Sequence, residues 1–249
     1  MRNIIKKSIS DFIDNYCKKN NLERIWEEPI VGFADVNSDY INNLKNVVLE
    51  SHYSPNDFLD DATIIVSYFL PFKREIVKSN KCEGLPSETW VKSYIVTNKM
   101  AQDINENIVN ELKGLGYDAV NPMNTGIFDR SILKSRWSQR HIAYAAGIGT
   151  FGINNLLISE KGSCGRYFSV ITNLDVKGDE PIKEDRCMYK KDKSCGVCVK
   201  RCEKGALTYE GFDRFKCSEA CQESERIMGA SVCGKCAVEL PCSYKNPIK

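Results

Sequence analysis

Residues 187–207 read CMYKKDKSCGVCVKRCEKGAL, and residues 217–242 read CSEACQESERIMGASVCGKCAVELPC. Nine of the chain's twelve cysteines fall in this tail, between Cys187 and the C-terminus. The other three are Cys17, Cys82 and Cys164. Lysine and glycine are frequent in the tail, and it lacks long apolar runs. A segment of this kind buries too little apolar surface to fold by core packing alone, so we expect it to fold around a bound metal or cluster.

The spacing of the tail cysteines is typical of one kind of cluster. In bacterial ferredoxins the run C-x2-C-x2-C-x3-C-P supplies three cysteines to one [4Fe–4S] cluster and the fourth to another. Cys195, Cys198 and Cys202 match the last three positions of that run, and Gly-Ala-Leu follows them as Gly-Ala-Ile or Gly-Ala-Leu follows in ferredoxins. A CxxC turn directs two sulfurs at one cluster, while the next cysteine, at the start of a helix, faces a second cluster. The sequence therefore predicts two [4Fe–4S] clusters.

The order of the cysteines predicts how they divide between the clusters. The first cluster is assigned Cys187, Cys195, Cys198 and Cys242. The second cluster is assigned Cys202, Cys217, Cys233 and Cys236. Cys221 lies four residues after Cys217, which puts both on the same face if that stretch is helical, so it is the rival ligand. Two oxidised clusters with four thiolates each carry about −4 in total, and the tail's 12 Lys and Arg against 8 Asp and Glu offset that charge.

Two other uses of these cysteines remain open alternatives. CxxC pairs also occur in zinc sites, but the x3 step and the Gly-Ala-Leu that follows favour iron and sulfide. Disulfides belong to secreted proteins. The N-terminal residues MRNIIKKSISDFIDNYCKKNN have helical periodicity rather than the apolar core of a signal peptide, so we expect a cytoplasmic protein without a membrane segment. For Cys17, Cys82, Cys164 and Cys221 the simplest interpretation is a buried or free thiol.

The first 180 residues differ from the tail, because they have apolar patterns typical of helices and strands. The chain has 42% hydrophobic and 27% charged residues, which is ordinary globular composition, and a net charge of +2, which favours neither nucleic acid nor membrane. Periodicity predicts helices at the N-terminus and over 89–113 and 135–146, and strands over 29–36, 61–72, 116–122 and two within 154–174. We therefore expect an α+β protein with one domain over 1–182 and a small second domain over 183–249.

A glycine-rich segment lies between the helix expected to end at residue 146 and the strand expected after residue 154. Gly147, Gly149 and Gly152 match G-x-G-x-x-G, but the dinucleotide fingerprint needs a strand before it and a helix after it. The order here is reversed, which excludes NAD binding at this motif. Two interpretations remain: a tight helix-to-strand turn, or a loop whose backbone closely approaches a flat cofactor.

These residues together suggest a family. The segments QRHIAYAAGIGTFGINNLLIS (139–159) and GRYFSVITNLDV (165–176), followed by the cysteine-rich tail, resemble the epoxyqueuosine reductase family and its short relatives. The resemblance runs from VGFADV (31–36) to the C-terminus. It implies a nitroreductase-like α/β sandwich domain that binds cobalamin, followed by a small bacterial-ferredoxin-like domain with two [4Fe–4S] clusters. It also implies that the clusters reduce a base-off cobalamin to nucleophilic Co(I), and that the loop Gly147–Gly152 lies at the corrin.

The resemblance also bears on the remaining site residues. Arg140 and His141 become candidate cofactor contacts, although a solvated helix face and a satisfied helix histidine explain them equally well. The family's proton-donating aspartate falls near Leu133, and Asp129 is the nearest carboxylate. The tRNA-acting members are longer and end in helical repeats, so tRNA is a doubtful partner here.

Three functions compete at this point. The first is a cobalamin-dependent iron–sulfur reductase that takes electrons from a ferredoxin or flavodoxin and passes them to an unidentified substrate. The second is an electron carrier or reductive activator of a corrinoid protein, with no substrate of its own. The third is a zinc-stabilised binding module.

Overall fold

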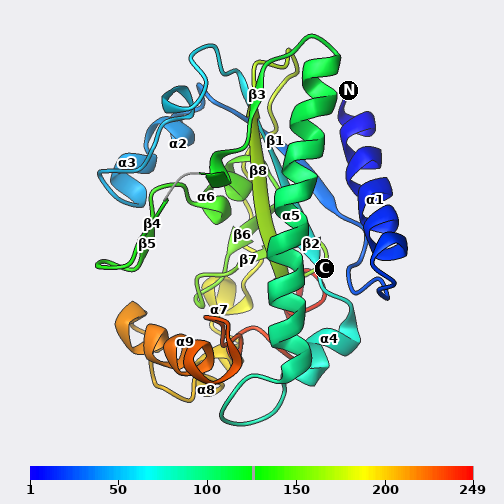
Figure 1. The fold of residues 1–249 in the computed structure, drawn as a ribbon. Coiled ribbons are helices and arrows are strands. Elements are labelled where there is room, and N and C mark those ends of the chain that lie inside the picture. The colour runs from blue at the N-terminus through cyan, green and yellow to red at the C-terminus, as the bar shows by residue number, and fades with distance from the viewer. Residues whose placement is uncertain (125–126, 249) are drawn as a thin grey trace.

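The fold, taken from a computed structural model, is described for residues 1–124 and 127–248, and it combines helices with a central antiparallel sheet (Figure 1). The sheet has the strand order β1 (Ile30–Asp35), β2 (Ile64–Pro71), β8 (Gly165–Thr172) and β3 (Ala119–Val120). Helices α1 (Arg2–Lys19) and α5 (Glu88–Gly114) cover one face. Helix α6 (Gln139–Ala145) packs on the other.

Shorter elements complete the chain. Before the tail they are α2 (Asp39–Asn42), α3 (Leu44–Val47), η1 (Pro55–Asp57), α4 (Arg74–Ser79), η2 (Pro122–Asn124), the paired strands β4 (Phe128–Asp129) and β5 (Lys134–Ser135), and the paired strands β6 (Gly149–Phe151) and β7 (Leu157–Ser159). The tail contains α7 (Met188–Asp192), α8 (Val197–Lys200) and α9 (Arg214–Met228), which lie together at one end of the molecule in Figure 1.

Strand β2 forms the centre of the fold, and all eight of its residues are buried. It pairs with β1 along one edge and with β8 along the other. Because side chains alternate across a strand, Val66 and Tyr68 point into the core beneath α1 and α5, whereas Ile65 and Phe69 point into the core beneath α6. A continuously apolar strand is what a sheet covered on both faces requires.

Most of the expected elements are confirmed by the structure. The N-terminal helix, the strands at 29–36 and 61–72, the long helix and the strand pair within 154–174 all form near their expected bounds. The strands of that last pair, β7 and β8, do not pair with each other, because β7 pairs with β6.

One expected element is wrong at its start. The helix expected over 135–146 begins only at Gln139, because Lys134 and Ser135 pair with Phe128 and Asp129 as a short hairpin. The N–H of Ser138 then donates to Nε2 of His52 rather than to a helical carbonyl.

The tail shares the core of the preceding residues. After β8, residues 173–187 run without regular structure, and the boundary expected near 182 lies in this stretch. Beyond it, the buried side chains of Ala230, Val232, Ala237 and Val238 join the core formed by α1, α5 and the sheet. In the described part of the chain, no helix is both long and apolar enough to cross a membrane.

Helix α1 gives a direct test of this packing. Ile9 is fully buried against α5, whereas Ile4 on the same helix is 55% exposed. We expect Ile9→Ala to lower the free energy of unfolding by about 2–5 kcal/mol, because a cavity is left in the core. Ile4→Ala is the matched control and should change it by less than about 0.5 kcal/mol. Anaerobic denaturant titration measures both, and equal effects would contradict the packing described here.

Candidate functional site

The short helices of the tail set the positions of its cysteines. Cys187 is the residue before α7, which ends at Lys193 in the left-handed conformation. Cys198 lies within α8, and Cys195 lies just before it. Helix α9 is capped by the Asp213 carboxylate, which accepts hydrogen bonds from two backbone N–H groups of its first turn. Cys217 and Cys221 lie one turn apart on α9, so their side chains share a face.

The structure brings four of the predicted ligands together in a first group. Cys187, Cys195, Cys198 and Cys242 line one small cavity. Burial, followed by the proximity of Cys187, raises the pKa of the Cys198 thiol to about 11. Burial and the neighbouring Cys187 and Cys198 raise the pKa of Cys242 to about 12. These thiols therefore resist losing their protons unless positive charge is placed among them.

Five further cysteines form a second group. Cys202, Cys217, Cys221, Cys233 and Cys236 line one wall of a larger cavity. Burial raises the pKa of Cys236, and its neighbours Cys217 and Cys233 raise it further. A hydrogen bond between the Cys217 and Cys221 thiols lowers the pKa of the one that accepts it, to about 7 where Cys217 accepts. The two thiols are equivalent in this respect, because either can donate to the other, so the structure leaves Cys221 as the rival of Cys217 for the fourth ligand position.

The chemistry of these donor sets fits an iron–sulfur cluster. Backbone N–H groups point at the sulfurs: Leu207 N lies 3.3 Å from Cys202 Sγ, and the Lys235 N–H donates to the Cys233 sulfur. Such donors stabilise thiolates. In residues 1–124 and 127–248, no three histidine, cysteine or acidic side chains are arranged to hold a single metal ion. All twelve cysteines are free thiols in the structure.

Residues outside the tail hold the Cys233–Cys236 turn. Nδ2 of Asn80 donates to the Cys233 carbonyl at 2.9 Å, and Nδ2 of Asn154 donates to the Cys236 carbonyl at 2.8 Å. The ammonium of Lys235, a residue only 5% exposed, donates to the Leu85 carbonyl at 3.1 Å. It also donates to the carbonyl of Cys82. We call residues 80–90 the clasp segment, because it wraps this turn.

Sequence reasoning did not identify the clasp segment or Asn154 as part of the site. Polar residues in loops are common, and no spacing rule connects Asn80 to a cysteine more than 150 residues away. The only available signal for Asn154 was its place just after the glycine-rich segment.

The larger cavity has a volume of about 600 Å³, within the usual range for small-molecule and cofactor sites. The second cysteine group and the clasp segment form part of its lining. Other lining residues include Tyr94, Arg140, Asn154 and Arg166. The Arg166 guanidinium stacks on the Tyr94 ring at 4.6 Å. The lining of this cavity thus combines the cysteine thiols of the second group with the guanidinium groups of Arg140 and Arg166.

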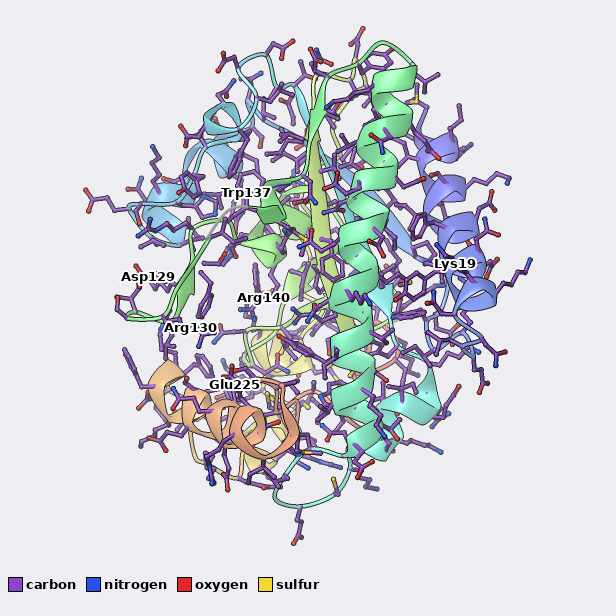
Figure 2. All side chains as sticks on the ribbon, viewed as in Figure 1. Lys19, Asp129, Arg130, Trp137, Arg140 and Glu225 are labelled. Carbon is purple, nitrogen blue, oxygen red and sulfur yellow. The ribbon has the colours of Figure 1, made fainter. Side chains whose placement is uncertain are left out.

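Arg140, a candidate cofactor contact, lies in this lining. Figure 2 shows it between α6 and the tail helices, and its guanidinium donates to the Asn155 carbonyl. The side chain is accessible to solvent in the cavity, yet protein surrounds that space. The surrounding protein, with a contribution from Arg166, lowers the pKa of Arg140, while nearby Cys236 and Cys217 oppose that shift. Even with this lowered pKa an arginine side chain remains charged at neutral pH, so the Arg140 guanidinium places a positive charge beside the second cysteine group.

The glycines of residues 147–152 approach the chain's own backbone closely. A Cβ on Gly149 would lie 2.4 Å from the Ile158 carbonyl oxygen, and one on Gly147 would lie 2.7 Å from the Glu180 carbonyl oxygen. Gly147 also has a positive φ of 67° at the end of α6. Gly152 lines the small cavity of the first group, while Gly147 and Gly149 line neither cavity. The tight turn is thus required by packing within the fold.

His141 lies apart from the larger cavity. Its Nδ1 is 2.7 Å from Ser138 Oγ, and its ring packs at 4.7 Å from that of Phe151. Burial, followed by the nearby charge of Arg140, lowers the pKa of His141 to about 4. The imidazole is therefore neutral at pH 7 and part of an aromatic cluster.

Asp129 lies on the β4–β5 hairpin, apart from Arg140 in Figure 2. Its carboxylate accepts hydrogen bonds from the N–H and hydroxyl of Ser131 at 3.0 and 2.6 Å, and forms an ion pair with Arg136 at 3.4 Å. The Ser131 hydrogen bonds, ahead of Arg136, lower the pKa of Asp129. Asp129 is therefore ionised at neutral pH, which is the wrong state for a proton donor. Leu133, where the family's aspartate was expected, has a left-handed backbone in the same hairpin.

Comparison with known proteins identifies solved structures of similar fold. No protein-family model and no curated protein matches the chain. Among solved structures, epoxyqueuosine reductase from Bacillus subtilis matches with a TM-score of 0.56 at 18% identity, over 94% of this chain and 65% of that one. An epoxyqueuosine reductase with an epoxyqueuosine-modified tRNA stem loop matches with the same TM-score and coverage at 19% identity. The catabolic reductive dehalogenase NpRdhA matches with a TM-score of 0.57 at 15% identity, over 88% of this chain and 30% of that one.

The chain thus spans about two thirds of the length of the epoxyqueuosine reductases and under a third of the dehalogenase. At these identities the likeness concerns the fold, and it confirms the expected likeness to epoxyqueuosine reductase and the expected mixture of helices and sheet. The two-cluster ferredoxin-like domain stays a prediction. The chain has a fold similar to that of epoxyqueuosine reductase and of B12-dependent reductive dehalogenases.

Proposed function

We propose that the protein is an iron–sulfur oxidoreductase that passes electrons through two [4Fe–4S] clusters to a bound cobalamin, and from there to a substrate not yet identified. The observation that carries this proposal is the gathering of the tail cysteines into two groups, of which the second lines a cavity of about 600 Å³. The similar fold of B12-dependent reductive dehalogenases supports it.

Eight cysteine side chains would provide the ligands of the two proposed clusters. Cys187, Cys195, Cys198 and Cys242 would hold the first cluster. Cys202, Cys217, Cys233 and Cys236 would hold the second, with Cys221 as the rival of Cys217 on the same face of α9. When bound, such clusters supply one-electron transfer. The protein contributes burial, backbone N–H donors and the charge of Arg140, which together set how readily the sites accept an electron.

Electrons would enter at the first group, because only the second group lines the larger cavity. Four exposed lysines lie in α7, at its C-cap or in α8, next to the first group: Lys190, Lys191, Lys193 and Lys200. Lys190 pairs with Asp185 at 3.7 Å, and the other three have no ion pair among the described residues. A positive surface of this kind attracts an acidic electron-transfer protein. A ferredoxin or flavodoxin is such a partner.

The cavity beside the second group is the proposed cobalamin site. Asn155 and Arg166 provide amide and guanidinium groups in its lining, which suit a cofactor rich in amides. Cobalamin would supply the bond-making chemistry, and the protein would position it and exclude water. The similar epoxyqueuosine reductase was seen with a tRNA stem loop, but at 19% identity the likeness concerns the fold alone, and we do not propose tRNA as the substrate here.

One observation favours a second function, that of an electron carrier or reductive activator of a corrinoid protein. Asp129 is held ionised by Ser131 and Arg136 and does not line the cavity, so it does not replace the family's proton donor. An activator needs no proton donor of its own. Fast reduction of an isolated corrinoid protein, without turnover of any small molecule, would support this alternative.

Metal content tests the proposal directly. Anaerobically prepared protein should contain about eight iron and eight sulfide per chain and give the electron paramagnetic resonance spectrum of reduced [4Fe–4S] clusters. Zinc without iron or sulfide would refute it.

Cys217 and Cys221 provide a matched pair of variants. We expect Cys217→Ser to lower the iron content to about four per chain, because Cys217 is the proposed fourth ligand of the second cluster. Cys221→Ser should retain about eight. Loss of iron in Cys221→Ser together with full iron in Cys217→Ser would reverse the ligand assignment.

The cavity can be blocked without disturbing the core. Ala220 lines it from α9 and is only partly buried, so Ala220→Trp should fill the space. We expect this variant to weaken cobalamin binding at least about tenfold, or about 1.4 kcal/mol, in an absorbance titration. Lys216→Trp, on an exposed position of the same helix outside the cavity lining, is the control and should bind like the parent protein. Equal binding by both variants would place cobalamin elsewhere.

A further inference from the structure

The three tryptophans of the chain differ in what their indole N–H groups contact. Nε1 of Trp26 donates to Thr97 Oγ1 at 2.8 Å, and Nε1 of Trp137 donates to Ser169 Oγ at 3.0 Å. Trp90 is only 6% exposed, and its Nε1 is buried without a hydrogen-bond partner among the described residues. A buried N–H without an acceptor costs free energy, so native proteins rarely retain one unless something absent from the protein chain accepts it.

The unpartnered N–H lies against the Cys233–Cys236 turn. A Cβ on Gly234 would come within 2.7 Å of Trp90 Nε1 and 2.6 Å of its Cζ2, so the indole edge packs directly on this turn. Gly234, with a φ of 80°, is the residue between Cys233 and Lys235. Trp90 and both cysteines line the same cavity.

The indole is held in this orientation. Trp90 lies in the first turn of α5, where Ser87 Oγ accepts its backbone N–H at 3.1 Å. Its ring meets that of Phe72 edge-on, with centroids 5.4 Å apart. The turn is fixed from its own side by the hydrogen bond between Asn80 and the Cys233 carbonyl. Neither partner can move away without breaking these contacts.

We propose that the Trp90 indole N–H donates a hydrogen bond to a sulfur of the second cluster, and that it raises the reduction potential of that cluster. This inference rests on the proposed function, because it requires the cluster to be present. A reduced cluster carries one more negative charge than an oxidised one, so a donor aimed at its sulfur stabilises the reduced form more. Trp90 would add a side-chain donor to the backbone donors Leu207 and Lys235.

Trp90→Phe removes the N–H and keeps an aromatic ring. In protein carrying both clusters and no added cobalamin, a redox titration followed by electron paramagnetic resonance measures each cluster separately. We expect the equilibrium constant for one-electron reduction of the second cluster to fall by up to about tenfold. Its reduction potential would then be lower by up to about 59 mV. The first cluster should be unchanged, and the iron content should stay at that of the parent protein.

Trp26→Phe is the matched control, because it also removes a buried indole N–H, from a side chain that lines neither of the two cysteine cavities. It breaks the bond to Thr97, so it should lower thermal stability and leave both potentials unchanged.

The outcomes separate the inference from the proposed function. Parent protein without iron overturns the proposed function. Full iron with an unchanged second potential in Trp90→Phe overturns the role of Trp90 and leaves the proposed function standing. If Trp90→Phe fails to fold or to keep its iron, parent protein with ¹⁵N-labelled indole decides. Coupling of one indole nitrogen to the reduced second cluster supports the inference, and its absence overturns it.

Discussion

The mutual repulsion of closely packed, buried sulfur atoms is the constraint on which the functional end of this molecule depends. A thiolate is unfavourable in a buried site, and several together are more so, as the raised pKa values of Cys198 and Cys242 indicate. In the second group, where burial also raises the pKa of Cys236, the structure places groups of the opposite polarity near the sulfurs: the N–H groups of Leu207 and Lys235, and the guanidinium of Arg140. These groups would stabilise the charge of thiolates at this site.

The sheet and its helices position this site. Strand β2, buried on both faces, fixes the relation between α5 on one side and α6 on the other. The N-terminal end of α5 brings the clasp segment to the Cys233–Cys236 turn, and the loop after β6 brings Asn154 to the same turn. The site is therefore composite, since the cysteines come from the tail while the groups that orient their turn come from residues 80–154.

Much of this arrangement could be predicted from the sequence, and the rest could not for identifiable reasons. The buried strands have strong apolar patterns, and the division of the tail cysteines into two groups followed from the spacing around Cys195, Cys198 and Cys202. The start of α6 was misjudged because a helical pattern does not reveal that Lys134 and Ser135 pair with another strand. The glycines at 147–152 allowed either a tight turn or close approach to a cofactor, and the structure shows close approach of Gly147 and Gly149 to the protein's own carbonyl groups. The sequence shows where the glycines are, but it does not show which backbone groups from other parts of the chain pack against them.

The packing of Val232, Ala237 and Val238 into the main core has a consequence for biogenesis. During synthesis the sheet and α5 are made before these residues, so the core stays incomplete until this part of the tail has been added. Until then the apolar surface that Val232, Ala237 and Val238 cover is exposed, and the unfinished chain is open to proteases.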